Sequence, residues 1–137
     1  MSTAYRTELS DFQRSSADLA RLWVANLPGC DEGLAQRKLR HGYLGNPAGR
    51  GVAVLLEAAG DGAPGVIGAQ GLHERRMHFG AASLRAGCMA DFVVDADHRS
   101  LGPALMLMKR AAEQAGQGFD VIYGLPNRNA AAVCARA

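Results

Sequence analysis

The chain has 137 residues, enough to bury the apolar core of one domain and too few for two. Apolar residues make up 48% and charged residues 20%, which excludes an intrinsically disordered chain. Fifteen basic residues against thirteen acidic ones give a net charge of +2, which does not indicate nucleic-acid binding. No stretch approaches about 18 apolar residues and no signal-peptide pattern opens the chain, so we predict a cytoplasmic protein without a membrane partner.

The cysteines and histidines do not form a metal-binding pattern. Cys30, Cys88 and Cys134 are odd in number and widely spaced, which is typical of reduced thiols in a cytosolic protein. His73 and His78 lie in one charged segment with no further ligand nearby, whereas a zinc site takes more ligands than these two. We therefore predict no metal.

The first part of the chain predicts a strand followed by two helices. Residues 4–9 alternate weakly between polar and apolar side chains, as a short strand does. From Ser15, where a serine can cap a helix, apolar residues recur at helical spacing as far as Leu27, and a Pro-Gly pair follows. A second, more polar helix is predicted over residues 31–44.

The middle of the chain predicts three strands. Residues 52–56 and 66–72 are apolar runs separated by turn residues at 60–64, the pattern of a hairpin. The charged, glycine-bearing stretch 74–82 is predicted to be a loop. Residues 84–94 then form a third, long strand.

The last part predicts helix, strand and helix. Apolar residues in 101–115 recur at positions i, i+3, i+4 and i+7, which buries one stripe of a helix against a sheet, and Gly116 and Gly118 end it. Residues 120–124 predict a short buried strand, and 127–137 begin another helix. The whole chain is therefore predicted to be a single mixed α/β (α+β) domain.

The third strand leads into the helix at 101–115 through a short polar loop that contains Arg99. Backbone N–H groups at a helix N-terminus are unpaired and lie at the positive end of the helix dipole, which favours phosphate binding. Gly102 allows a ligand to approach the backbone closely. The junction therefore predicts a phosphate-binding turn.

The spacing Arg99-x-x-Gly102-x-Ala104 resembles the Arg/Gln-x-x-Gly-x-Gly/Ala signature of the GNAT N-acetyltransferase superfamily, whose loop holds the pyrophosphate of an acyl-CoA. The order of the predicted elements resembles the GNAT fold from its first strand to its fourth helix. Local agreements are the Gly-Val-Ile-Gly run at 65–68, the Val-Asp pair at 94–95, and the stretch 123–127 with Asn129 after it.

This resemblance implies a mainly antiparallel central sheet flanked by helices, and acetyl-CoA as the acyl donor without a metal. It implies that the amine of a small molecule or a peptide attacks the thioester directly and takes up the acetyl group. The residues implied to cradle the pyrophosphate are Arg99, Ser100, Leu101, Gly102, Pro103 and Ala104. Those implied to run beside the pantetheine arm are Phe92, Val93 and Val94, and Asn129 would lie on its far side.

Amine acetylation requires a base to remove the proton of the amine and an acid to protonate the departing thiolate. Asp91 is the candidate base because of its position on the third strand, and His73 and His78 are rival candidates. Pro103 lacks the N–H that another residue would offer to phosphate, although proline is tolerated in the first turn of a helix.

The GNAT resemblance also implies a tyrosine acid in or just after the last helix and two further strands. The corresponding positions hold Arg136 or lie beyond Ala137. We therefore expect that the domain is C-terminally incomplete and that the polypeptide continues past Ala137, or that another chain covers the edge of the 120–124 strand, as in a homodimer.

Two other functions are compatible with the same residues. A non-catalytic acyl-CoA-binding or regulatory module would keep the phosphate loop and lack the acid. A structural or interaction domain would keep the fold alone. Binding of acetyl-CoA separates the last hypothesis from the others, and release of thiol with amines separates the first two.

Overall fold

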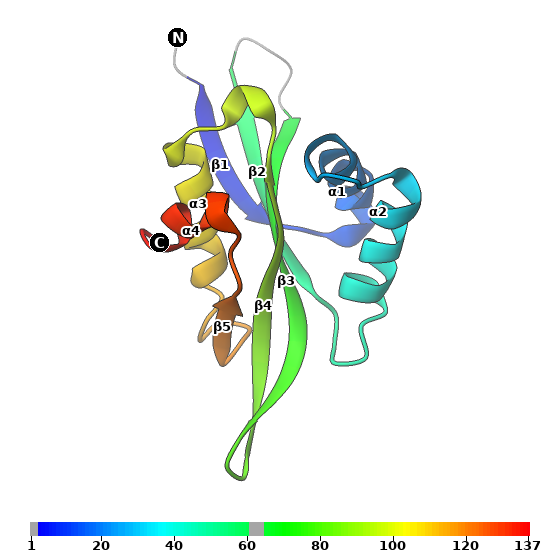
Figure 1. The fold of residues 1–137 in the computed structure, drawn as a ribbon, viewed down its shortest axis with the longest axis vertical. Helices are drawn as coiled ribbons and strands as arrows, with labels where there is room; N and C mark the ends of the chain where they lie inside the picture. The colour runs from blue at the N-terminus through cyan, green and yellow to red at the C-terminus, as the bar shows by residue number, and fades with distance from the viewer. Residues whose placement is uncertain (1–2, 61–64) are drawn as a thin grey trace.

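The computed structural model describes residues 3–60 and 65–137, and the predicted turn at 60–64 falls largely outside them. The described residues form a five-stranded sheet with the strands in chain order (Figure 1). The first four strands pair antiparallel, and the fifth pairs parallel with the fourth. The predicted α+β fold with a mixed, mainly antiparallel sheet is therefore confirmed. The strands are β1 (Ala4–Leu9), β2 (Val52–Ala59), β3 (Gly65–Phe79), β4 (Ala82–Val94) and β5 (Val121–Gly124).

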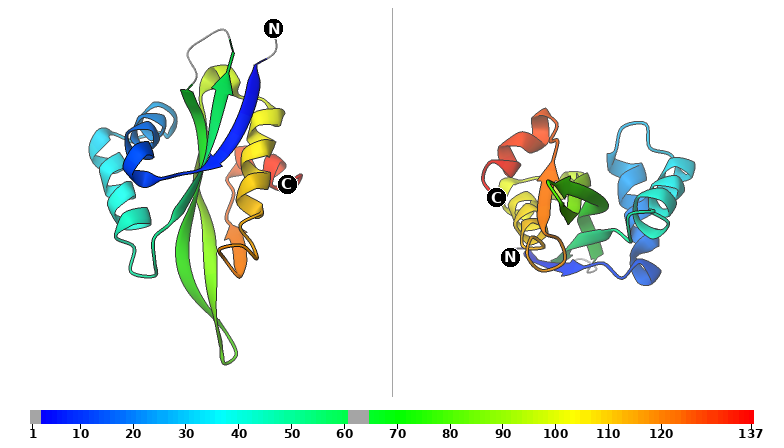
Figure 2. Two further views of the ribbon diagram at one scale, coloured as in Figure 1. Left: turned by 180° about the vertical axis from the view of Figure 1, so that it is seen from behind. Right: turned by 90° about the horizontal axis from the view of Figure 1, so that it is seen from below.

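Helices cover both faces of the sheet (Figure 2). One face carries α1 (Phe12–Asn26) and α2 (Glu32–Lys38), which continues into a π-helix, η1 (Leu39–Leu44). The other face carries α3 (Leu101–Ala112) and α4 (Arg128–Cys134), and a short 3-10 turn, η2 (Ala96–His98), precedes α3. Among the described residues, no helix combines the length and apolar character needed to cross a lipid bilayer.

Strand β2 is continuously apolar because helices cover both of its faces. Ala53 and Leu55 pack into the core under α1 and α2, whereas Val54 and Leu56 pack into the core under α3. Successive side chains of a strand point to opposite faces, so a strand covered on both sides needs apolar residues throughout.

The first helix begins earlier than Ser15. It starts at Phe12 because Asp11 is the N-cap, and the Asp11 carboxylate accepts a hydrogen bond from the backbone N–H of Gln13 at 3.1 Å. The second helix begins at Glu32, one residue after the predicted start, because Asp31 is its N-cap and the carboxylate accepts from the N–H of Leu34 at 2.7 Å. Its last part widens into η1, which the periodicity did not predict.

The predicted loop at 74–82 is wrong. Strands β3 and β4 stay paired as far as Phe79 and Ala82, and Gly80, at φ 59°, lies in the tight turn between them. The hairpin extends well beyond the rest of the domain (Figure 1). Its charged composition misled the prediction because Glu74 is buried, held by two hydrogen bonds from the Arg85 guanidinium across the strand pair.

The C-terminal elements differ slightly from their predicted bounds. Helix α3 ends at Ala112, and a turn containing Gly116 at φ 81° leads to β5. Strand β5 is half-buried rather than buried, and within the described residues β4 is its one neighbour. Helix α4 begins after Asn127, whose side chain caps it by accepting from the N–H of Ala130 at 2.9 Å.

Tyr43 anchors η1 in the core under α1 and α2. Its ring stacks on Trp23 with centroids 5.6 Å apart, and the residue is completely buried. The Tyr43 hydroxyl passes so close to β3 that a Cβ atom on Gly71 would lie 1.8 Å from it. Glycine at position 71 is therefore required by this close approach.

We expect Gly71→Ala to lower the free energy of unfolding by about 1–3 kcal/mol, because its methyl group must displace either Tyr43 or the strand. Gly65→Ala, in the same strand, is the matched control, since a Cβ there meets nothing within 4 Å. Urea unfolding of both variants measures the difference. Equal stabilities would contradict the packing described for Tyr43.

Candidate functional site

A β-bulge interrupts the pairing of β3 with β4. Ala69 pairs with Val93 and Gly71 with Ala90, so two residues, Asp91 and Phe92, stand opposite Gln70. Asp91 has a φ of 55°, in the left-handed region that non-glycine residues rarely adopt. The Gln70 amide spans the gap by donating hydrogen bonds to the carbonyls of Gly71 and Ala90, both at 2.9 Å.

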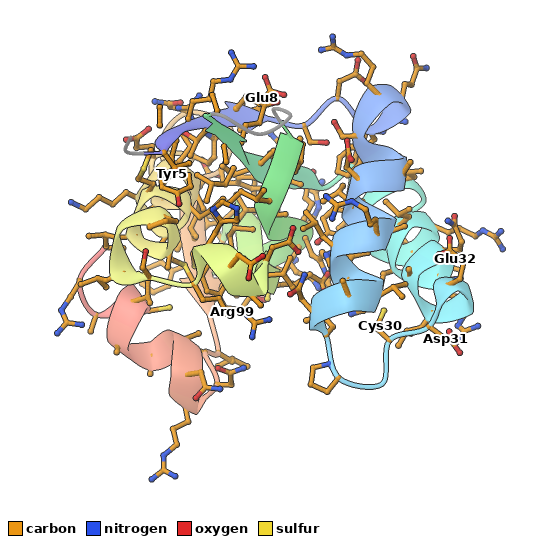
Figure 3. All side chains as sticks on the ribbon, turned by 90° about the horizontal axis from the view of Figure 1, so that it is seen from above. Tyr5, Glu8, Cys30, Asp31, Glu32 and Arg99 are labelled. Atoms are coloured by element: carbon orange, nitrogen blue, oxygen red, sulfur yellow. The ribbon has the colours of Figure 1, made fainter. Side chains whose placement is uncertain are left out.

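The bulge forms the floor of an open cleft of about 990 Å³. Strand β4 runs along the floor, the end of α1 and one side of α2 form one wall, and α3 and α4 form the other. Figure 3 shows Arg99 between these two walls, with Cys30 across the cleft at the start of α2.

The cleft gathers most of the residues predicted from the sequence. Two predicted residues, Gly102 and Pro103, do not line it and lie in the first turn of α3 beside it. Those that line it are Asp91, Phe92, Val93, Val94, Arg99, Ser100, Leu101, Ala104 and Asn129.

Fewer backbone amides are free at the α3 N-terminus than predicted. The N–H groups of Arg99 and Ser100 donate to carbonyls within the loop, at 3.3 and 2.9 Å. Pro103 has no N–H, and the N–H of Ala104 donates to the Ser100 carbonyl at 3.4 Å. Because the first amides of a helix have no partner within it, Leu101 and Gly102 are left to bind an anion. A Cβ on Gly102 would meet nothing within 4 Å, so the approach to these amides is open.

The Arg99 side chain stabilises this loop. Its guanidinium donates to the Val94 carbonyl at 2.9 Å and to the Asn26 side-chain oxygen at 2.8 Å. The Asn26 amide in turn donates to Asp95 at 2.8 Å. Sequence analysis missed Asn26 because it ends α1, far from the motif, and nothing in its local pattern indicates this contact.

The Asp91 side chain is only 7% exposed and is in contact with three side chains from distant parts of the chain. Its carboxylate accepts hydrogen bonds from the Lys38 ammonium at 2.7 Å and the Tyr43 hydroxyl at 2.9 Å. His73 Nε2 lies 3.3 Å from the same carboxylate. The His73 contact is longer than the other two and does not meet hydrogen-bond geometry.

These contacts fix the ionisation of Asp91 and Tyr43. Burial raises the pKa of Asp91, but the contacts with His73, Lys38 and Tyr43 outweigh it and lower the pKa from 3.8 to about 2. Burial, together with the neighbouring Asp91 charge, raises the pKa of Tyr43 well above 10. At neutral pH, Asp91 is therefore a stable carboxylate and Tyr43 keeps its proton.

A carboxylate with so low a pKa is a weak proton acceptor at neutral pH. The base role of Asp91 stays a prediction, and the geometry favours an electrostatic role, in which Asp91 holds Lys38 at the wall of the cleft. Of the rival bases, His73 contacts Asp91 from behind the bulge and does not line the cleft. His78 lies near the tip of the β3–β4 hairpin.

The cysteines are free thiols, and Cys30 and Cys134 line opposite walls of the cleft. Within residues 3–60 and 65–137, no group of three or more His, Cys, Asp or Glu side chains could hold a metal ion.

No protein-family model matches the sequence, and no curated protein matches it either. Solved acetyltransferase structures are similar to it along nearly the whole chain. A predicted acetyltransferase from Clostridium acetobutylicum, solved with acetyl-CoA, superimposes with a TM-score of 0.67 at 13% identity, covering 97% of this chain and 88% of that one. The chain has the GNAT acetyltransferase fold.

Two further structures with the GNAT fold are similar to this chain. The ribosomal-protein-alanine N-acetyltransferase from Brucella melitensis has a TM-score of 0.58 at 23% identity, covering 91% of this chain and 82% of that one. The glucosamine-6-phosphate N-acetyltransferase from Arabidopsis thaliana has a TM-score of 0.61 at 11% identity, covering 92% and 84%. The acceptors named for these two enzymes differ, a ribosomal-protein alanine and glucosamine-6-phosphate, so the GNAT fold alone does not identify an acceptor.

We expect Asp91→Asn to lower the free energy of unfolding by about 2 kcal/mol at pH 6, because the folded state favours the ionised carboxylate. A lowered pKa stabilises the fold above the unfolded value of 3.8 and loses this effect as pH falls toward 2. The stability difference between parent and variant should therefore shrink between about pH 4 and pH 2.

Urea unfolding at several pH values measures this difference. Asp97→Asn, at an exposed position in η2, is the control and should unfold like the parent throughout. A parent–variant difference for Asp91→Asn that stays constant down to pH 2 would contradict the ion-pair assignment.

Proposed function

We propose that the protein is an acetyl-CoA-dependent N-acetyltransferase that transfers the acetyl group to an amine by direct attack. The observation that supports this best is the composition of one cleft: β4 residues 92–94, the α3 N-terminus and Asn129 of α4 line it together, as the GNAT resemblance implies. The fold similarity supports the same function.

The residues present fit a phosphate-bearing donor. The free amides of Leu101 and Gly102 lie at the positive end of α3. In the described structure the Ser100 side chain does not cap the helix, so its hydroxyl is available for a phosphate oxygen. Phe92, which lines the cleft at the bulge, would lie beside the pantetheine arm. Acetyl-CoA would supply the thioester, while the protein aligns the amine with it.

In this reaction, the amine nitrogen forms a bond to the acetyl carbon as the carbon–sulfur bond breaks. The proton lost by the amine goes to a base or to water, and the CoA sulfur leaves as a thiolate that is then protonated. Lys38 lies at the wall of the cleft beside the bulge, and its positive charge would stabilise negative charge that develops there.

We expect Gly102→Glu to abolish acetyl-CoA binding, because its side chain places bulk and negative charge where the pyrophosphate would lie. The fold should tolerate the change, since Gly102 has open space around it. Gly118→Glu adds the same charge away from the cleft, at a position where a Cβ meets a single side-chain atom at 4.0 Å, and is the matched control. Calorimetric titration with acetyl-CoA measures both variants, and parent-like affinity of Gly102→Glu would refute the proposed donor site.

A non-catalytic acyl-CoA-binding module is the second candidate, because no tyrosine lines the cleft among the described residues. Tyr43 is buried and its hydroxyl donates to the Asp91 carboxylate. Tyr123 lies on β5, where it pairs with Cys88 of β4. Release of free thiol from acetyl-CoA in the presence of a panel of amines supports the transferase. Tight acetyl-CoA binding with no thiol release from any amine supports the binding module.

A further inference from the structure

Positive charge is concentrated in two segments on the α2 side of the bulge. Residues 37–51 and 73–91 together hold seven of the fifteen basic residues and two of the thirteen acidic ones. The rest of the chain holds eight basic and eleven acidic residues. The small net charge of the whole chain therefore hides a strongly cationic region beside a mildly acidic remainder.

Both acidic residues of this region are neutralised internally. Glu74 is buried against the Arg85 guanidinium, and Asp91 is buried against Lys38. Five arginines remain exposed, and within the described residues none of them forms an ion pair with an acidic side chain. Arg76 follows Arg75 in β3 and points to the opposite face of the hairpin. We call the other four the arginine surface; they are Arg37, Arg40, Arg50 and Arg75.

The two segments that carry the arginine surface pack against each other. The Asn46 side chain donates to the Glu74 carbonyl at 3.0 Å, and Gly42 lies directly against the His73 ring. In Figure 1 the chain that follows α2 and the β3–β4 hairpin occupy the lower end of the molecule. Lys38 connects this end to the cleft, because it lies in α2 next to Arg37 and lines the cavity.

We infer that the acceptor amine is presented by an acidic polypeptide segment, whose carboxylates bind the arginine surface while its amine reaches the bulge. The inference rests on the proposed function. Arginine forms paired hydrogen bonds with carboxylates. Arg37, Arg40 and Arg75 lie on separate elements, α2, η1 and the β3–β4 hairpin, which an extended segment can contact together. Single-stranded nucleic acid fits less well, because it also needs aromatic platforms for its bases. The exposed aromatic side chain in these two described segments is Phe79, near the hairpin tip.

Two fluorescent peptides of equal length, each with a free N-terminal amine, test this inference. One carries glutamates after the first residue, and the other carries glutamines at the same positions. Fluorescence anisotropy is measured with protein saturated with CoA, so that the donor site is occupied. We expect the glutamate peptide to bind roughly tenfold more tightly at about 50 mM salt, and its advantage to shrink at about 500 mM, because exposed ion pairs are screened.

The double variant Arg37→Gln/Arg75→Gln should remove most of this preference and leave CoA affinity unchanged. Lys109→Gln/Arg136→Gln removes the same charge from the α3–α4 side and is the matched control. Equal binding of the two peptides, or an equal loss in the control variant, would overturn the inference. So would an oligonucleotide that binds more tightly than the glutamate peptide and loses affinity in Phe79→Ala.

Acetylation of the two peptides, followed by mass spectrometry, links the arginine surface to the reaction. We expect the glutamate peptide to be acetylated faster in the parent and the difference to disappear in Arg37→Gln/Arg75→Gln. Faster acetylation of the glutamine peptide would overturn the acceptor assignment while leaving the transferase intact. Failure of acetyl-CoA to bind the parent would instead overturn the proposed function, and calorimetry detects it without any peptide.

Discussion

The hydrogen bond from Tyr43 to Asp91 joins the helical layer to the sheet at the point where β4 leaves regular pairing. Asp91 adopts a left-handed conformation that costs an ordinary residue about 1 kcal/mol or more. The contacts with Tyr43 and Lys38 offset that cost, and both partners are held by the α2–η1 segment. Tyr43 reaches the bulge because Gly71 leaves room for its hydroxyl. The floor of the cleft therefore depends on how η1 packs in the core.

The loop between β4 and α3 is held by contacts with both the sheet and α1. Strand β4 ends at Val94, and the Val94 carbonyl accepts from Arg99, which is held in turn by Asn26 at the end of α1. The free amides of α3 therefore have a fixed position relative to both walls of the cleft. The α3 end of the cleft offers backbone donors for a phosphate, and the α2 end offers the ammonium of Lys38. One strand thus separates the backbone donors at the α3 end from the Lys38–Asp91 ion pair at the α2 end.

The sequence predicted the parts of this arrangement that are encoded locally. The strand–loop–helix motif around Arg99 was recognisable because its glycine and its helix lie within a few residues of it. The hairpin was missed because the burial of Glu74 depends on Arg85, across the strand pair. The environment of Asp91 could not be predicted either, since Lys38 is 53 positions away and becomes its neighbour only when α2 packs beside the bulge. Long-range ion pairs leave no periodic signal in one sequence.

The arrangement of charge bears on the proton transfer that acetylation requires. An ammonium group that lies beside the ammonium of Lys38 loses its proton more readily, because like charges lower the pKa of the amine. The acidic segment proposed to present the amine would bind the arginine surface with its carboxylates, away from the bulge, while the amine lies near Lys38. A lowered amine pKa would reduce the demand on a protein base. Both oxygens of the Asp91 carboxylate already accept hydrogen bonds, which is compatible with such a reaction. The task of Asp91 is then to hold Lys38 and Tyr43 in place while water carries the proton away.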